Sequence, residues 1–348
     1  MGTGPDTDTG TGLGIVAIGR NEGARLGRCL ASLAGAGRLV YVDSGSTDDS
    51  IALAEGLGAE IVHLDTARGF TAARARNAGL DRLMAAGAPE YVQFVDGDCE
   101  VEPGWIDQAR AVLAGDPGLA CVAGRRAERF ADASIFNRLC DMEWNTPIGE
   151  TRAVGGDALY RTAALTQVGG FDAGFICGEE PELCFRLRRA GWRIRRLDAP
   201  MTRHDAAMTR WHQWWRRTRR TGWAWAEGAA TYGTTPERYN VRETRSALFW
   251  GLAVPAGMLA AGVLAVLWHW AWGLAVPGVL GLGWRQTRRV ARSRAQAFDD
   301  PPGHARLYGR MVMLGKIPEA MGVLDYWWHR LRGQPGRIIE YKTAGDDP

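Results

Sequence analysis

Two acidic side chains stand two positions apart directly after an apolar segment. The sequence VDGDCE contains Asp96 and Asp98 with Gly97 between them, and the strand-like run YVQFV leads into it. Carboxylate oxygens at this spacing, in a turn that glycine relaxes, suit ligation of Mg²⁺ or Mn²⁺ shared with phosphate groups. In an arbitrary loop the same tripeptide is ordinary solvated turn chemistry. The pair therefore predicts a divalent-metal site only in combination with the elements around it.

Polar clusters follow two earlier apolar segments in the same way. LGIVAI runs into Gly19–Glu22, and RLVYVD ends in Asp43, which opens the stretch DSGSTDDS. In parallel sheets, ligands bind beyond the carboxyl ends of the strands, so the three clusters could meet in one crevice. Taken alone, Asp43 also fits a turn or helix-cap aspartate.

The elements that must position these residues alternate regularly. Five segments read as strands, and helical patterns lie between them: LGIVAI, RLVYVD, EIVHL, YVQFV and LACVAG. This rhythm predicts an α/β fold with a mostly parallel sheet and helices on both faces. Helices are expected near 22–34, from Thr47 and near 71–86, and an amphipathic stretch at Glu179–Ala190 ends at a plausible helix stop, Gly191.

Composition limits the class of protein. The chain has 348 residues, 46% of them hydrophobic, and a net charge of +3, which fits a folded protein and gives no argument for nucleic acid as a partner. Six cysteines without metal-ligand spacing indicate reduced thiols and a cytosolic environment. Residues 1–12 lack the features of a secretory signal and are predicted to form a flexible tail.

A long apolar region follows the α/β part. Ala247–Trp268 contains 22 residues without a formal charge, enough to cross a hydrocarbon core of about 30 Å. A second run, Trp270–Trp284, is shorter and would either return across the membrane or re-enter it. Arginines flank both sides, which by the positive-inside rule predicts a hairpin with both ends in the cytoplasm. The alternative is a buried helical hairpin of a soluble domain.

Tryptophan is concentrated late in the chain. Of the 15 tryptophans, 12 lie after residue 210, and the segment RWHQWWRRTRRTGWAW places several near one helical face. Tryptophan favours membrane–water interfaces, so this segment predicts an interfacial helix. A tryptophan-rich helix docked on the α/β domain explains the same pattern.

Five ordered segments resemble bacterial family 2 glycosyltransferases with the GT-A fold. They are IVAIGRNEGARLGRCLASL, VDSGSTDDS, ARARNAGL, VDGD, and VGGDALYRTAALTQVGGFD followed by GEEPELCFRLRRAGW. The resemblance extends from about Leu13 to Gly228. It implies a nucleotide-sugar donor, Mg²⁺ or Mn²⁺ as cofactor, and single-displacement transfer with inversion.

The resemblance also implies roles for individual residues. The donor would be bound by Gly19, Arg20, Asn21, Glu22, Asp43, Arg76, Asn77 and Asp96. Asp98 corresponds to the direct metal ligand, Asp96 to the residue that orients metal-bound water or the ribose, and His204 to a third metal ligand. A lone histidine is otherwise a surface or structural group. Asp43 would accept a hydrogen bond from the donor's base, for which uracil is preferred.

The acceptor side is implied by two further motifs. Glu180 takes the position of the family's general base, although the family more commonly has aspartate there and Pro181 follows directly; Glu179 is the alternative base. Gly155 and Gly156 resemble a glycine pair that lets backbone approach the sugars, with Asp157 beside them as a ligand of a sugar hydroxyl. The Gln-x-x-Arg-Trp motif of processive synthases is absent in this order, so processive synthesis is not supported.

These observations predict a membrane-associated transferase. The expected order is a tail (1–12), a GT-A domain (13–228, donor half 13–124 and acceptor half 125–228), a linker (229–246), an apolar hairpin (247–284) and a basic, interfacial region (285–348). The acceptor would be a lipid-linked or membrane-proximal glycan in exopolysaccharide or cell-surface glycan synthesis, at the inner face of the cell membrane. The alternatives are a non-catalytic membrane scaffold or glycan-binding subunit with this fold, and a sugar nucleotidyltransferase, for which a Gly-rich basic loop after the first strand is missing.

Overall fold

The computed structural model describes residues 12–334 and forms two compact units. Within the described residues, the sheet unit comprises 12–131 and Glu143–Ala207, and the helical unit comprises Asp132–Met142 and 208–334. All but the last residue of the predicted tail, and the end of the predicted region 285–348, lie outside the described residues. The units separate at other points than the predicted domains, which therefore remain a prediction.

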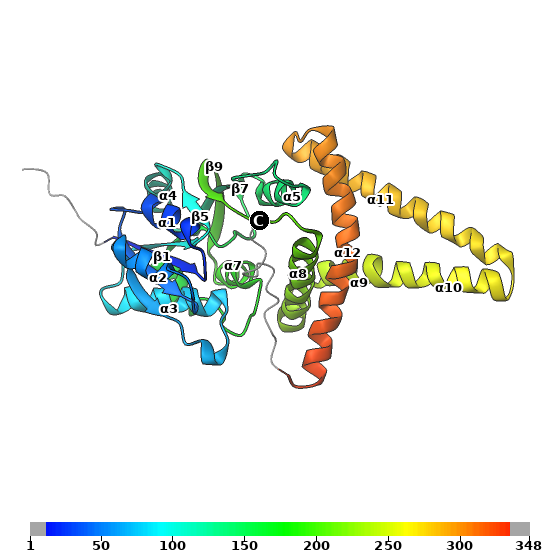
Figure 1. The fold of residues 1–348 in the computed structure, drawn as a ribbon, viewed down its shortest axis with the longest axis horizontal. Helices are drawn as coiled ribbons and strands as arrows, with labels where there is room; N and C mark the ends of the chain where they lie inside the picture. The colour runs from blue at the N-terminus through cyan, green and yellow to red at the C-terminus, as the bar shows by residue number, and fades with distance from the viewer. Residues whose placement is uncertain (1–11, 335–348) are drawn as a thin grey trace, which may run out of the picture. The chain divides into compact units, whose positions relative to one another are not determined.

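The sheet unit is organised around one nine-stranded sheet (Figure 1). The strand order is β3-β2-β1-β4-β8-β6-β9-β5, with β7 paired to β9. The strands are β1 (Leu13–Gly19), β2 (Arg38–Asp43), β3 (Glu60–His63), β4 (Tyr91–Asp96), β5 (Cys99–Val101), β6 (Leu119–Glu128), β7 (Gly149–Glu150), β8 (Ala158–Arg161) and β9 (Arg193–His204). The five strands expected from the sequence are β1, β2, β3, β4 and β6, and all are confirmed.

Helices connect and cover these strands. They are α1 (Ala24–Ser32), α2 (Ser50–Gly56), the 3₁₀ turn η1 (Thr66–Arg68), α3 (Ala72–Ala85), α4 (Trp105–Gly115), α6 (Thr162–Val168) and α7 (Glu179–Arg189), while α5 (Ile135–Trp144) has residues in both units. The predicted helices near 71–86 and at 179–190 are α3 and α7. Thr71 caps α3 by accepting a hydrogen bond from the backbone N–H of Arg74 at 3.1 Å.

The α/β class is confirmed, and the sheet has both strand directions. β1 pairs in parallel with β2 and β4, β2 with β3, and β6 with β9. The six buried residues that open β1 explain its central place, because a parallel strand covered on both faces must be apolar throughout. β8 runs antiparallel between β4 and β6. The regular strand–helix alternation of the sequence ends before β8, so this direction was not visible in the pattern.

Helices cover both faces of the sheet (Figure 1). α1 and α4 lie on one face, where Trp105 of α4 donates from its ring nitrogen to Gln93 of β4 at 3.0 Å. α3 and α7 lie on the other face. Gly79 brings α3 close to β1, since a Cβ there would stand 2.3 Å from a methyl of Val16. With this packing, the carboxyl ends of β1, β2 and β4 open at one edge.

The helical unit contains the C-terminal helices. They are α8 (Trp211–Tyr232), α9 (Val241–Leu248), the π-helical turn η2 (Phe249–Ala253), α10 (Val254–Leu267), the 3₁₀ turn η3 (Trp270–Leu274), α11 (Ala275–Phe298) and α12 (Pro302–Leu331). α8, the tryptophan- and arginine-rich segment, packs tightly on α12: a Cβ at Gly222 would stand 1.9 Å from the carbonyl oxygen of Glu319. Trp214 and Trp223 are buried, whereas Trp211 is 45% exposed.

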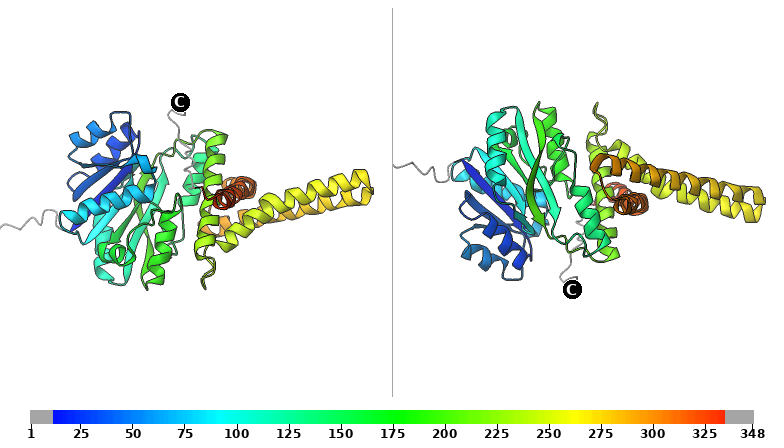
Figure 2. Two further views of the ribbon diagram at one scale, coloured as in Figure 1. Left: turned by 90° about the horizontal axis from the view of Figure 1, so that it is seen from below. Right: turned by 90° about the horizontal axis from the view of Figure 1, so that it is seen from above.

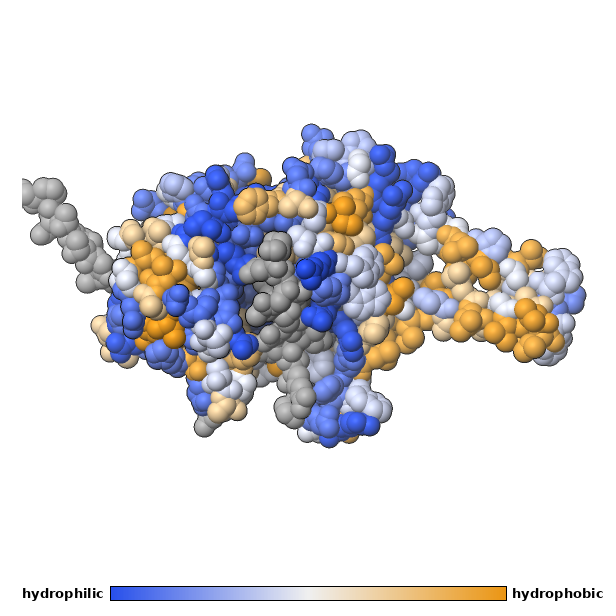
Figure 3. All heavy atoms as spheres, viewed as in Figure 1, coloured by the Kyte–Doolittle hydropathy of each residue, from blue (hydrophilic) through white to orange (hydrophobic). Residues whose placement is uncertain are grey.

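α10 and α11 lie side by side as a two-helix arm of the helical unit (Figures 1 and 2). Hydrophobic residues cover much of its surface (Figure 3). One helix among residues 12–334, Val241–Leu267, is long and apolar enough to cross a membrane by length and composition. The second apolar run, Trp270–Trp284, divides between η3 and the first part of α11, which continues as a basic helix to Phe298.

Candidate active site

Asp96, the last residue of β4, lies between two guanidinium groups. Arg76 of α3 donates from Nη2 to its Oδ1 at 2.8 Å, and Arg126 of β6 donates from Nη2 to its Oδ2 at 2.7 Å. Burial alone would raise the pKa of Asp96, but the two arginines outweigh burial and lower it. Asp96 is therefore an ionised carboxylate shared between two cations.

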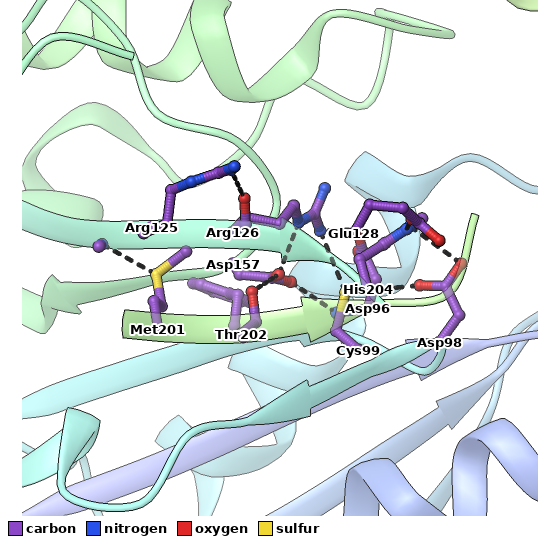
Figure 4. Close-up of polar contacts among 12 residues, drawn as sticks. Asp96, Asp98, Cys99, Arg125, Arg126, Glu128, Asp157, Met201, Thr202 and His204 are labelled. Carbon is purple, nitrogen blue, oxygen red and sulfur yellow. Dashed lines mark hydrogen bonds and ion pairs between the residues drawn. The ribbon is translucent and has the colours of Figure 1, made fainter. Parts of the chain in front are cut away.

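Asp98 lies against His204 across the turn that follows β4 (Figure 4). Its Oδ2 stands 3.2 Å from Nε2 of His204, and Nδ1 of the same ring stands 3.5 Å from Oε2 of Glu128. Strand pairing creates this cluster, because His204 at the end of β9 is opposite Cys99 of β5 and Glu128 of β6. Burial would lower the pKa of His204, but Asp98 and Glu128 together raise it.

The Asp98–His204 pair has the donor atoms of a divalent-metal site. Carboxylate oxygen suits Mg²⁺ and Mn²⁺, and an added imidazole nitrogen is compatible with Mn²⁺. A ligating histidine usually directs its second ring nitrogen to a carboxylate, and Glu128 occupies that position. Cys99 is adjacent, but burial raises the pKa of its thiol, which disfavours the thiolate form that binds metals.

Asp157 is enclosed by donors of the sheet unit (Figure 4). Its side chain accepts from the backbone N–H of Asp96 at 3.1 Å, from Nε of Arg126 at 2.7 Å and from the hydroxyl of Thr202 at 2.7 Å. Asp157 is 1% exposed. The expected contact between Asp157 and a sugar hydroxyl stays a prediction. The carboxylate orients Arg126 and the backbone at the end of β4.

Two adjacent glutamates at the start of α7 share Arg76. Nη1 of Arg76 donates to Oε1 of Glu179 at 2.7 Å, and Nη2 stands 3.1 Å from Oε1 of Glu180. The side chain of Glu179 is 4% exposed and that of Glu180 is 17% exposed. Burial and the charge of Glu179 raise the pKa of Glu180 to about 7, although Arg76 opposes the shift. Glu180 is thus a partly accessible carboxyl group that titrates near neutral pH.

The two glycines of the predicted pair differ in their surroundings. A Cβ at Gly156 would stand 2.5 Å from Nη2 of Arg76 and 2.8 Å from Oδ2 of Asp96, whereas a Cβ at Gly155 would meet nothing within 4 Å. Close approach of backbone is therefore required at Gly156 alone. What the backbone approaches there is the Arg76–Asp96 pair.

Asp43 organises the loop that follows β2. Its Oδ2 accepts hydrogen bonds from the backbone N–H groups of Gly45 and Ser46, both at 2.9 Å, and the hydroxyl of Tyr41 lies 3.3 Å from its Oδ1. This is the turn-capping role that the sequence left open. A carboxylate has about four acceptor positions, so Oδ1 retains capacity for another donor.

The loop after β1 is tied to this turn through Asn21. Its backbone N–H donates to the hydroxyl of Ser46 at 2.9 Å, and its side-chain oxygen accepts from the N–H of Thr47 at 2.7 Å. Asn21 has a φ of 55°, a left-handed conformation that asparagine tolerates. Arg20 lies 4.6 Å from the ring centre of Phe70. The residues Gly19–Glu22 and Asp43 therefore border one edge of the sheet, as expected.

Asn77 binds the backbone of the loop before α7. Its amide donates to the carbonyl of Phe171 at 2.7 Å and accepts from the N–H of the same residue at 2.9 Å. Asn77 thus clamps the loop that precedes α7, and both ends of its side chain are engaged there.

Arg126 and Glu128 were absent from the residues expected from the sequence. Arg126 bridges Asp96 and Asp157, with its guanidinium 5.3 Å from the ring centre of Trp144. Neither residue belongs to a recognisable motif. The signal that could have found them is their place at the end of β6, which requires the pairing of β6 with β9.

Comparisons with family models give the class of protein. Residues 15–158 match the family model described as Glycosyl transferase family 2, and residues 105–285, more than half of the chain, match Glycosyl transferase family group 2. The chain belongs to glycosyltransferase family 2.

Two relatives align over part of the chain. The pre-mycofactocin glycosyltransferase of Mycobacterium tuberculosis is 30% identical over 197 residues, which cover 52% of this chain and 40% of that protein. The succinoglycan biosynthesis protein ExoA of Rhizobium meliloti is 29% identical over 171 residues, which cover 45% of this chain and 50% of that protein. The chain thus matches half or less of each relative's length.

A solved structure agrees in fold over most of the chain. The mannosyltransferase PcManGT from Pyrobaculum calidifontis, in complex with GDP-Man and Mn²⁺, superposes with a TM-score of 0.58 at 18% identity, covering 91% of this chain and 87% of that one. At 18% identity this superposition shows a shared fold and no more.

Proposed function

We propose that this glycosyltransferase moves a sugar from a nucleoside-diphosphate donor to an acceptor hydroxyl in a single displacement with inversion. Glu180 takes the proton of the acceptor hydroxyl, the oxygen forms a bond to the anomeric carbon, and the bond from that carbon to the diphosphate breaks. The electron pair of that bond leaves with the nucleoside diphosphate. The observation that carries the proposal is the position of Glu180, a 17% exposed carboxyl group 3.1 Å from the buried Arg76, which also binds Asp96; burial and Glu179 raise the pKa of Glu180, as a general base requires.

Arg76 and Asp96 hold Glu180 in place, because Arg76 contacts both carboxylates. Arg76 is 2% exposed and joins Glu179, Glu180 and Asp96, so one cation fixes three carboxylates. Glu179 is nearly buried and holds the guanidinium at 2.7 Å, which leaves Glu180 as the more accessible carboxylate. This supports Glu180 over Glu179 as the base.

We assign the cofactor to Asp98 and His204, with Glu128 behind the histidine. Mg²⁺ or Mn²⁺ at this position would neutralise charge on the departing diphosphate. Asp98 and His204 contribute an oxygen and a nitrogen only 3.2 Å apart, and Asp96, two residues earlier at the end of β4, would orient metal-bound water or the ribose.

The donor's base is assigned to the edge formed by Gly19–Glu22 and Asp43, with a UDP-sugar preferred. Support comes from the spare acceptor capacity of Asp43 Oδ1 and from the ordered loop around Asn21. The structurally similar mannosyltransferase was solved with GDP-Man, so GDP-sugars belong in any donor panel.

The acceptor is proposed to be a lipid-linked or membrane-proximal glycan of exopolysaccharide or cell-surface synthesis, at the cytoplasmic face of the cell membrane. The exposed apolar helix Val241–Leu267 supports a membrane location. One relative is named for succinoglycan biosynthesis, which supports a polysaccharide pathway.

The test compares Glu180→Gln with Glu179→Gln in purified protein in detergent. Nucleoside diphosphate release is measured with UDP- and GDP-sugars, Mn²⁺ or Mg²⁺, and then EDTA. Loss of a general base reduces turnover by about 10²–10⁴-fold, while UDP binding by calorimetry stays within about threefold of wild type. Retained activity in Glu180→Gln with loss in Glu179→Gln would move the base to Glu179. Absence of product from every donor would favour a non-catalytic scaffold, and a retained anomeric configuration by NMR would exclude single displacement.

A further inference from the structure

α11 changes from apolar to basic within one turn. The ten residues Ala275–Trp284 carry no formal charge, and arginines follow at 285, 288, 289, 292 and 294. Ten helical residues rise about 15 Å, so the first arginine lies about that far from the end of the helix that joins η3. A bilayer leaflet contributes about half of a hydrocarbon core of about 30 Å. The apolar part of α11 therefore matches one leaflet in length.

α10, the other helix of the two-helix arm, and the residue that follows it expose apolar side chains as well. Leu259, Val266 and Trp268 are 72%, 85% and 82% exposed. The preceding turn η2 is held inside the helical unit, since a Cβ at Gly251 would stand 1.8 Å from the carbonyl oxygen of Lys316 in α12. The part of the arm that is free to contact lipid thus begins near Val254, beyond that contact.

Arg294 of α11 is buried and paired with Asp300, whereas the other four arginines of this helix form an uncompensated positive surface. Within residues 12–334, Arg285, Arg289 and Arg292 have no ion-pair partner and are exposed, and Arg288 stacks on the ring of Trp284 at 3.7 Å. Arg285 and Arg289, like Arg288 and Arg292, are four residues apart, a spacing at which like charges destabilise a helix. An anionic partner would remove this repulsion.

Two cavities open beside these arginines. One, of about 410 Å³, is lined by Arg242 of α9, by residues of α11 that include Arg289 and Ser293, and by Tyr308 of α12. The other, of about 430 Å³, is lined by Arg285, Arg289, Arg292, Ser293 and Gln296. Guanidinium and hydroxyl donors line both, and oxygens of a phosphate group accept from such donors.

We propose that the α10–α11 arm enters a single membrane leaflet and that Arg285, Arg289 and Arg292 bind the phosphate groups of anionic phospholipids at its surface. This rests on the membrane association proposed above and is independent of the sugar transferred. If the arm reached the far side of the bilayer, Arg285 would be drawn about 15 Å into hydrocarbon and Arg292 about 5 Å, since each helical residue rises about 1.5 Å, and charged side chains are strongly disfavoured there. Entry into one leaflet places them at the level of the phosphates.

The first test measures binding to vesicles without any turnover. The full chain is sedimented with phosphatidylcholine vesicles containing or lacking 30% phosphatidylglycerol, and Arg289→Gln/Arg292→Gln is compared with wild type. A basic residue near an anionic surface contributes about fivefold in affinity, equivalent to about 1 kcal/mol, so the double variant should bind phosphatidylglycerol vesicles about 25-fold more weakly.

The controls separate charge at this site from other causes. Arg189→Gln removes an exposed arginine of the sheet unit and should bind within about twofold of wild type. Circular dichroism checks that each variant is folded. Equal binding to both vesicle types, or unchanged binding of the double variant, would overturn the proposal. So would competition by 10 mM inorganic phosphate beyond that of chloride at equal ionic strength, because the site would then bind free phosphate.

The second test measures the depth of the arm. All six native cysteines are buried, so Gly273→Cys in η3 and Gln296→Cys in α11 introduce selectively reactive thiols. In proteoliposomes with the protein added from outside, an impermeant maleimide should label position 296 from outside and position 273 only after detergent. Labelling of position 273 by reagent trapped inside the vesicles would show that the arm crosses, and labelling from outside would show that it does not insert; either result refutes entry into one leaflet.

Discussion

Replacing Glu180 by glutamine should stabilise the folded protein at alkaline pH while it reduces transfer by about 10²–10⁴-fold. The pKa of Glu180 is raised to about 7 by burial and by Glu179, so ionising this group disfavours the folded state. The stabilisation given by the protonated form is fully present below the unfolded pKa, near 4.5, and is lost as pH rises through about 7. Glutamine is neutral at every pH, so the stability of the variant does not fall as the pH rises through about 7.

The size of the effect follows from the same shift. The pKa moves from 4.5 to about 7, and each pKa unit corresponds to about 1.4 kcal/mol, which sets an upper limit of about 3.5 kcal/mol. For a domain of 150–250 residues this upper limit is a rise in Tm of roughly 7–14 °C. At pH 5 the difference between variant and wild type should be below about 1 kcal/mol.

The assay is thermal unfolding followed by circular dichroism and by tryptophan fluorescence, at pH 5.0 and pH 8.5. Glu182→Gln is the matched control in the same helix. Glu182 is fully buried and both its oxygens accept from Arg186, at 2.7 and 2.8 Å. Breaking this pair should lower stability at both pH values by about 3 kcal/mol, the opposite sign.

Two results would refute the reasoning. If Glu180→Gln is less stable than wild type at pH 8.5, the carboxylate of Glu180 in the wild type is stabilised by Arg76, and its ionisation does not destabilise the fold. A gain that is equal at both pH values would point to packing of the amide, because ionisation of Glu180 changes between them.

Three further outcomes are expected. Below pH 7, log(kcat/KM) should rise with a slope of about 1 as Glu180 loses its proton and should level off above, and a flat profile between pH 5.5 and 8 would exclude this base. Glu128→Gln should weaken Mn²⁺ binding about 10–100-fold, measured by electron paramagnetic resonance, because the support of His204 is lost; unchanged affinity would remove Glu128 from the site. Gly156→Ala should reduce activity strongly, since its Cβ would stand 2.5 Å from a nitrogen of the buried arginine, whereas Gly155→Ala should behave as wild type in the same donor assay.

The parallel half of the sheet could be predicted because its signals are local. β1, β2 and β4 are short apolar runs that each end in polar residues, and a buried parallel strand needs that pattern. The clusters at Asn21, Asp43 and Asp96 follow from the rule that ligands bind at the carboxyl ends of such strands. The helix of Glu180 was visible from its amphipathic period and from Gly191.

Other features depend on contacts between distant segments. The direction of β8 is set by its neighbours β4 and β6, and its four residues carry no signal for it. Arg126 and Glu128 acquire roles only because β6 pairs with β9 in a register that sets Glu128 opposite His204. Asp157 accepts hydrogen bonds from three internal donors that come from β4, β6 and β9, a set that no local pattern indicates, and its expected contact with a sugar hydroxyl stays a prediction.

The sequence by itself determined the family, the order of the strands along the chain and the positions of the acidic clusters, because these depend on residue type and local period. Tertiary structure decided how the pKa values of the carboxylates differ. Asp96 lies between two arginines, which lower its pKa, whereas Glu180 shares one arginine with two other carboxylates, so burial and repulsion raise its pKa to about 7. Proton affinity depends on the charges and solvent around a group, and packing alone fixes those.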